Sequence, residues 1–384
     1  KPREGMRIHD PTGGSGGMLI ECGRFVDDHG GNARNLTLTA QEKNVGTWAI
    51  CKLNMLLHNS PDADIRAGDT IRNPKFLDAN RLMTFDRVIA NPPFSLKEWG
   101  YDFAQSDPYR RFHRGIPPNT KGDMAFLQHM VEICNERGMV GVVMPHGVLF
   151  RGAAEATIRR ALLEEDLVEA VVGLPEKLFF GTGIPASILI LNKAKPVARR
   201  GKVLFIDASP EGFYEEGSKN NRLRLQDILR IAAVFNAYAE PGEVPGAIDA
   251  LRDAWLSAAE RHHKRQLKRA AHSDAETKER ILAEHDARVA EINEAAEAVR
   301  QWLRAKNPGG RSSLDKFAAV VTVEEIADEN DYNLNISRYV ESADQPPQLD
   351  VKKELAILRE LETARDKAER EMDRLLKELG YGTK

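Results

Sequence analysis

Short apolar runs alternate with longer segments of helical periodicity along the first half of the chain. The runs predict strands at 6–9, 36–40, 63–67, 88–90, 139–144, 168–172, 187–191 and 202–206. Amphipathic segments between the runs predict helices at 18–26, 44–57, 123–135 and 153–163. Because parallel strands need helical crossovers, this alternation indicates an α/β protein with a doubly wound, mainly parallel sheet.

The pattern changes after the last predicted strand. A helix at 225–238 and a Pro- and Gly-containing linker lead to a long, charged, alanine-rich helical segment at 247–306. Beyond Gln345-Pro346-Pro347, apolar residues from Val351 to Leu379 form a helical stripe suited to packing on other helices. We therefore divide the chain into a sheet domain at 1–240, a charged helical insert at 241–310, a connecting segment at 311–347 and a C-terminal partner-binding helix at 348–384.

Composition narrows the class of protein. The chain has 384 residues, enough for one large domain and an appendage, and a net charge of −3. Proteins that bind DNA unaided are usually basic, so any basic surface is local or is supplied by a partner. The three cysteines are far apart without metal-ligand spacing, which favours reduced thiols in a cytoplasmic protein. No segment is apolar enough to cross a membrane, and no signal peptide is visible.

A glycine-rich turn follows the first predicted strand. It runs from Asp10 to Gly17 with the sequence DPTGGSGG, and a helix begins directly after it. Glycines let the backbone approach a ligand, and the helix amino terminus favours a negative group. The candidate cofactor-binding residues here are Asp10, Gly14, Ser15, Gly16 and Gly17; a merely flexible loop is the alternative. The dinucleotide fingerprint and the P-loop lysine are both absent.

Two carboxylates follow the next strands. Glu42 ends the second strand, where a carboxylate can accept both hydroxyls of a ribose. The alternative is a helix-start carboxylate, because a helix follows at 44–57. Asp69 follows the third strand and either accepts from the adenine amine of a cofactor or caps a helix.

The fourth predicted strand stops at Asn91-Pro92-Pro93-Phe94. Two prolines make a stiff loop at the carboxyl end of a strand, where ligands bind in open α/β sheets. The exocyclic amine of a nucleobase is a poor nucleophile, and acceptors on its hydrogens make its nitrogen more tetrahedral. The Asn91 side chain and the Pro92 carbonyl can be those acceptors, and Phe94 can stack on the base. An ordinary turn is the alternative interpretation.

The order of these segments resembles adenine-N6 DNA methyltransferases in which the cofactor motif precedes the catalytic motif. Four flanking phrases look like the modification subunit of type I restriction–modification systems. They are LNMLLH at 53–58, LPE at 174–176, FGTGIP at 180–185 and YNLNISRY at 332–339. Phe179, directly before the third phrase, and Phe180, its first residue, either line a base pocket or pack the final hairpin.

The resemblance implies a site-specific DNA methyltransferase whose domain spans 1–240. S-adenosylmethionine would lie over the glycine turn, and a flipped adenine would receive the methyl group at N6 with no metal required. The implied partners are DNA, a specificity subunit and a restriction subunit, with two modification subunits per specificity subunit. The family's amino-terminal helical domain and upstream cofactor motif are not found in this sequence, so we expect the chain alone to bind the cofactor poorly or to be inactive.

Two alternatives stay open. One is a methyltransferase for another amino group: cytosine N4, an RNA base or a protein glutamine. The other is a truncated, catalytically inert scaffold subunit of a DNA-binding complex. The order of the motifs and the flanking phrases argue against the first, and the intact Asn91-Pro92-Pro93-Phe94 argues against the second.

Overall fold

The computed structural model describes residues 1–179, 183–305 and 312–341, together with seven residues between 362 and 378. The chain divides into two units, residues 1–342 and 343–384. The seven described residues of the second unit are all helical. The first unit contains the sheet and the candidate site.

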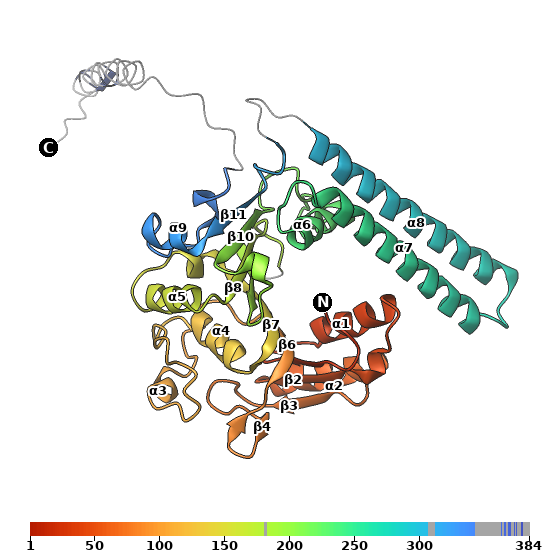
Figure 1. Cartoon of the computed structure of the whole chain (residues 1–384), viewed down its shortest axis with the longest axis horizontal. Helices are drawn as coiled ribbons and strands as arrows, with labels where there is room; N and C mark the ends of the chain where they lie inside the picture. Colours follow the sequence, from red (N-terminus) through yellow and green to blue (C-terminus); the bar gives the residue numbers. More distant parts are fainter. Residues whose placement is uncertain are drawn as a thin grey trace. The chain divides into compact units, whose positions relative to one another are not determined.

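A nine-stranded sheet forms the centre of the first unit (Figure 1), in the order β3-β2-β1-β6-β7-β9-β8-β10-β11. Its strands are β1 Arg7–Asp10, β2 Thr37–Glu42, β3 Asp64–Ala67, β6 Phe85–Ala90, β7 Cys134–Pro145, β8 Val168–Gly173, β9 Ala186–Asn192, β10 Lys202–Asp207 and β11 Ala318–Thr322. Only β9 and β11 run antiparallel to their neighbours. The predicted doubly wound, mainly parallel sheet is confirmed.

The chain reverses its direction of travel across the sheet beside β1. It passes from β1 outward to β2 and β3, and then returns to β6 on the opposite side of β1. All four strands are parallel here. Crevices at such switch points, outside the carboxyl ends of the strands, are where open α/β sheets bind ligands.

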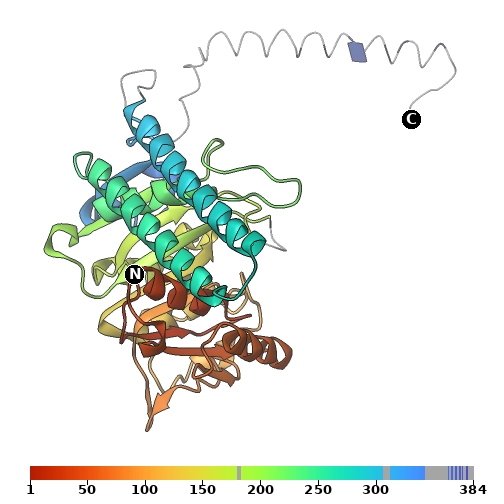
Figure 2. The same cartoon turned by 90° about the vertical axis from the view of Figure 1, so that its right-hand side faces the viewer.

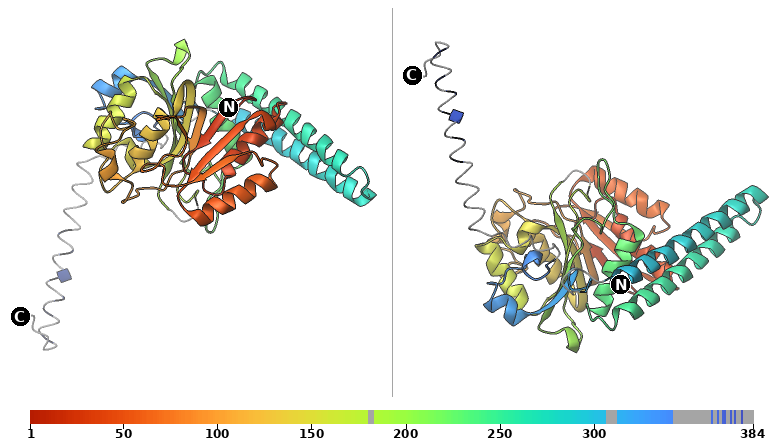
Figure 3. Two further views of the ribbon diagram at one scale, coloured as in Figure 1. Left: turned by 90° about the horizontal axis from the view of Figure 1, so that it is seen from below. Right: turned by 90° about the horizontal axis from the view of Figure 1, so that it is seen from above.

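Helices cover both faces of the sheet, as Figure 3 shows from two sides. They are α1 Gly17–Asp28, α2 Val45–Leu57, α3 Tyr101–Ala104, α4 Asp123–Glu132, α5 Ala154–Glu164, α6 Leu225–Ala237, α7 Val244–Arg269, α8 Ala275–Arg304 and α9 Val323–Asp328. Along β10, Val203 and Phe205 pack in the same cluster as α4 and α5. The alternate residues Leu204 and Ile206 pack with α6, α7 and α8 on the other face.

Helices α7 and α8 form a long antiparallel hairpin that contacts α1 (Figure 2). The Arg265 guanidinium pairs with the Asp28 carboxylate at 3.1 Å, and Arg261 donates to the Asp28 carbonyl. Both acceptors lie at the end of α1, where a helix attracts cations. Arg261 and Arg265 of helix α7 therefore bind another helix of the same chain.

The structure corrects three predicted boundaries. The helix predicted at 123–135 ends at Glu132, because Cys134 already pairs with Phe85 as the first residue of β7. The helical segment predicted at 247–306 is two helices, and the Asp274 side chain caps the second by accepting from the Thr277 amide at 2.8 Å. Helix α7 begins inside the predicted linker, with Pro245 in its first turn, where no amide donor is needed.

The connecting segment also contributes a strand that the sequence pattern did not reveal. β11 pairs antiparallel with β10 from Lys202–Thr322 to Ile206–Ala318. Separately, β4 Leu77–Asp78 and β5 Arg81–Leu82 form a small two-stranded sheet. The first unit therefore draws on residues from both sides of the α7–α8 hairpin.

All three cysteines are free, as predicted. Cys51 and Cys134 are buried, whereas Cys22 is only partly buried. Burial raises the pKa of each of the three thiols to about 11. Within the described ranges, no helix combines the length and the apolar character needed to cross a membrane.

Candidate active site

The carboxyl ends of β1, β2, β3 and β6 bring the predicted site residues to one edge of the sheet. In the parallel ladders Asp10 is opposite Ala40, and Glu42 is opposite Ala67. Asn91 directly follows β6, which pairs with β1 on its other side. The glycine turn, Glu42, Asp69 and the Asn91–Phe94 segment thus share the edge at the switch point.

The glycine turn packs tightly on α2. Gly16 has a φ of +83°, and a Cβ at this position would lie 3.0 Å from the Cys51 sulfur. Only glycine fits both constraints. The Asn54 side-chain amide donates to the Ser15 carbonyl at 3.0 Å. The amino terminus of α1 has no side-chain cap, so its amides suit a negatively charged ligand group.

Glu42 joins the glycine turn to the start of α2. One carboxylate oxygen accepts from the Gly14 amide at 3.0 Å, and the other accepts from the Asn44 amide at 2.8 Å. The helix-start interpretation explains the second contact and not the first. A carboxylate accepts about four hydrogen bonds, so capacity remains for two ribose hydroxyls. The ribose contact stays a prediction.

Asp10 is a buried carboxyl beside the glycine turn. Its Oδ1 accepts from the Thr12 amide at 2.9 Å. Burial raises its pKa to about 7, helped by the nearby Glu42 carboxylate and opposed by the two hydrogen bonds from Thr12. Asp10 therefore changes charge near neutral pH, at a position where a bound cation would favour its ionised form.

Asp69 already has partners on both oxygens. Its Oδ1 accepts from the Ile71 and Arg72 amides at 3.0 Å each, and its Oδ2 pairs with Lys43 at 2.9 Å. Burial opposes ionisation, yet these contacts together hold its pKa below the ordinary value. The described residues between β3 and β4 contain no helix, so the helix-cap alternative is wrong: Oδ1 accepts from the amides of a turn. The contact with a cofactor amine stays a prediction. No sequence pattern marks Lys43, because an exposed lysine after a strand is common.

The Asn91–Phe94 segment presents the groups that base chemistry needs. Asn91 and Pro93 are exposed, Pro92 is buried and Phe94 is partly exposed. Within the described parts of the chain, neither the Asn91 side chain nor the Pro92 carbonyl takes part in a hydrogen bond. Both acceptors are therefore available to an incoming amine, and the Phe94 ring is accessible for stacking.

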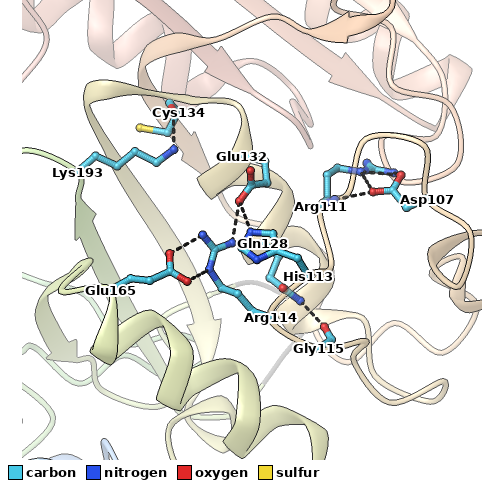
Figure 4. Close-up of polar contacts among 10 residues, drawn as sticks. All are labelled: Asp107, Arg111, His113, Arg114, Gly115, Gln128, Glu132, Cys134, Glu165 and Lys193. Atoms are coloured by element: carbon cyan, nitrogen blue, oxygen red, sulfur yellow. Dashed lines mark hydrogen bonds and ion pairs between the residues drawn. The ribbon is translucent and has the colours of Figure 1, made fainter.

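The irregular segment beyond this loop is fixed by buried arginines, which Figure 4 shows at close range. Arg111 is fully buried, pairs with Asp107 at 2.9 Å and donates to the Ile71 carbonyl at 2.6 Å. Arg114 lies between Glu132 at 2.7 Å and Glu165 at 2.6 Å. No sequence pattern marks these residues, because the segment has no helical or strand periodicity.

The structure tests the prediction for only one of the two phenylalanines, Phe179 and Phe180. Phe179 packs against the cluster that contains α6 and β10. This contact supports the packing interpretation for Phe179. Phe180, Gly181 and Thr182 lie outside the described residues.

The doubly wound sheet carries a glycine turn after β1, a carboxylate at the end of β2 and Asn-Pro-Pro-Phe after β6. This arrangement is typical of a methyltransferase. The sequence model of the N-6 DNA Methylase family matches residues 1–250 and 266–347. The chain belongs to this family.

Several methylase subunits of type I restriction enzymes are similar to the chain in sequence. The methylase subunit of the type I restriction enzyme MjaVII from Methanocaldococcus jannaschii is 31% identical over 92% of this chain and 49% of its own length. The HindI methylase subunit from Haemophilus influenzae is 34% identical over 60% of this chain and 51% of its own length. The chain thus spans about half the length of these relatives.

A solved structure is also similar to the chain. The methyltransferase subunit of a type I restriction–modification system from Streptococcus thermophilus aligns with a TM-score of 0.59 and 29% identity. The alignment covers 88% of this chain and 55% of that one. The family resemblance in the sequence is confirmed by these comparisons.

Proposed function

We propose that this chain is the modification subunit of a type I restriction–modification complex and transfers a methyl group from S-adenosylmethionine to N6 of adenine in DNA. The observation that carries the proposal is the Asn91 side chain, exposed and free of hydrogen bonds among the described residues, beside the available Pro92 carbonyl. Both lie at the edge of the sheet that holds the glycine turn. The names of the relatives support the same reaction.

The residues present fit the proposed cofactor. The uncapped start of α1 and the turn from Gly14 to Gly17 would hold its carboxylate, and Glu42 would accept from its ribose. Asp10 would face its positive charge, and Asp69 would accept from its adenine amine. S-adenosylmethionine supplies an electrophilic methyl group on a sulfonium. The family and the donor set support this cofactor, which is positively charged and nucleoside-containing.

The catalytic loop would hold a flipped adenine. Extrusion of a base costs a few kcal/mol, and stacking on Phe94 offsets about 1–3 kcal/mol of this cost. The Asn91 side chain and the Pro92 carbonyl accept from the two amine hydrogens and orient the nitrogen lone pair. The proton that the amine loses leaves to solvent, so no side chain near the loop has to act as a strong base.

The partners follow from the same assignment. A net charge of −3 is low for unaided DNA binding, which supports a separate specificity subunit that reads the sequence. In this proposal residues 1–240 carry the methyltransferase activity and residues 348–384 bind the specificity subunit. The complete complex would contain two modification subunits per specificity subunit and a restriction subunit for cleavage.

The decisive experiment is Asn91→Ala in the complex with the specificity subunit. Methyl transfer from labelled S-adenosylmethionine to unmethylated DNA should be lost, because the amine loses an acceptor. Calorimetry should show a nearly unchanged cofactor dissociation constant. Asn293→Ala on the exposed face of α8 is the matched control and should leave both values unchanged.

The product distinguishes the alternatives. Nucleoside analysis should find N6-methyladenine in the DNA. If the methyl group is found instead at cytosine N4, in RNA or on a protein glutamine, the substrate is not adenine in DNA. A folded, assembled wild-type complex that binds S-adenosylmethionine without transferring its methyl group would identify an inert scaffold.

A further inference from the structure

A buried carboxylate on α4 reaches the end of the catalytic loop. The Asp123 side chain is 1% exposed, and its Oδ1 accepts from the Ser95 amide at 2.7 Å. Ser95 directly follows Phe94 and has a φ of +52°. A residue with a side chain rarely adopts this left-handed conformation, so it persists only where the surroundings hold it. Asp123 supplies that hold.

Arg151 fixes the orientation of the carboxylate. Its Nη1 lies 3.1 Å from the Asp123 Oδ2 and 3.1 Å from the Glu155 Oε1. Both carboxylates are buried, and two such groups without a cation between them would be strongly unfavourable. A Cβ on Gly147 would lie 2.3 Å from the Arg151 guanidinium, so an alanine at this position would make the arginine side chain shift. The arginine therefore lies between the two buried carboxylates and holds Asp123 in place.

The segment that carries the YNLNISRY phrase is linked to Arg151 through a second arginine, Arg159. Arg159 on α5 is buried and donates to the Tyr332 carbonyl at 2.8 Å. The same guanidinium donates to the carbonyls of Arg151 at 2.9 Å and Val148 at 3.1 Å. A chain of contacts thus runs from Tyr332 through Arg159 and Arg151 to Asp123.

We propose that Asp123 is a positioning residue that holds the Asn91–Phe94 segment, through the Ser95 amide, in the conformation required for methyl transfer, and that Arg151 fixes Asp123. The part concerning methyl transfer rests on the proposed function. The rest of the loop has its own attachments: the Gly122 amide donates to the Leu96 carbonyl at 2.9 Å, and the Trp99 indole donates to the Pro118 carbonyl at 2.9 Å. Loss of Asp123 should therefore loosen the segment locally.

Two substitutions at Asp123 separate its hydrogen bond from its charge. Asp123→Ala removes both and should lower kcat about tenfold to a hundredfold, as expected for one hydrogen bond to a charged group. Asp123→Asn keeps an acceptor for the Ser95 amide and should lose less. The dissociation constant and KM for S-adenosylmethionine should stay unchanged in both, because Asp123 contacts the base side of the site.

Amide hydrogen exchange of the peptide 91–99 tests the same idea without catalysis. Exchange should be faster in Asp123→Ala than in the wild type, while peptides from α7 and α8 exchange as before. Gly147→Ala, which displaces the Arg151 guanidinium, should reproduce the faster exchange and the lower kcat without altering either carboxylate. Glu291→Gln, which breaks an exposed 2.6 Å ion pair with Arg288, is the matched control and should change neither value.

The outcomes separate this inference from the proposed function. Wild-type exchange and kcat in a folded Asp123→Ala chain would overturn the inference, and so would a loss of cofactor affinity equal to the loss of kcat. If Asp123→Ala does not fold, Gly147→Ala decides by the same two readouts. A wild-type complex that makes no N6-methyladenine would refute the proposed function and the part concerning methyl transfer, whereas the exchange rates would still decide whether Asp123 holds the loop.

Discussion

Asp10 gives the free energy of unfolding a pH dependence that one substitution should remove. Burial raises the pKa of its carboxyl from 3.8 to about 7. The folded chain therefore keeps a proton that the unfolded chain releases. The free energy of unfolding is therefore highest, as far as Asp10 contributes to it, below about pH 4. It falls as the pH rises to about 7, by about 1.4 kcal/mol per pH unit. Over about three units the loss amounts to about 4 kcal/mol.

The assay compares wild type with Asp10→Asn by urea unfolding at several pH values. The amide can still accept from the Thr12 amide and does not ionise in this range. Other groups titrate in both chains and cancel in the difference. Between about pH 5 and about pH 7, the stability of Asp10→Asn should gain about 3 kcal/mol relative to wild type. A difference that stays constant with pH would refute the reasoning.

Two further predictions concern the cofactor and the assembly. Glu42→Ala should weaken S-adenosylmethionine binding about tenfold to a hundredfold by calorimetry, because it removes a charged acceptor. An unchanged affinity in a folded variant would leave Glu42 only its contacts with Gly14 and Asn44. Removal of residues 343–384 should keep the thermal unfolding temperature of the first unit and abolish co-purification with the specificity subunit; a truncated chain that unfolds, or that still co-purifies, would contradict the docking role.

The sequence predicted the sheet and the segments at its switch point because their signals are local. A run such as Val88-Ile89-Ala90 indicates a short strand from its own residues, and two prolines end it. Glycines after the first strand likewise specify a turn without reference to distant residues. Parallel order then follows from the alternation of strands and helices, which is why the candidate residues meet.

The contacts that shape the loop were hidden because they join residues far apart in sequence. Asp123 is 28 positions from Ser95, and Arg159 is 173 positions from the Tyr332 carbonyl. No periodicity marks a carboxylate that will face a particular amide. β11 was missed for a related reason: its five residues become a strand only because β10 offers a free edge.

The pairing of β10 with β11 has a consequence for how the family can vary. Since these strands are hydrogen-bonded neighbours, the α7–α8 hairpin is a detour whose two ends are held close together by the sheet. The family's sequence model skips residues 251–265, which lie inside α7. Turns of helix can therefore be added to or removed from the hairpin without shifting the register of any strand. The length of the hairpin can change during evolution, or by design, while the strand pairing is kept, and the contacts of Arg261 and Arg265 with the end of α1 would change with it.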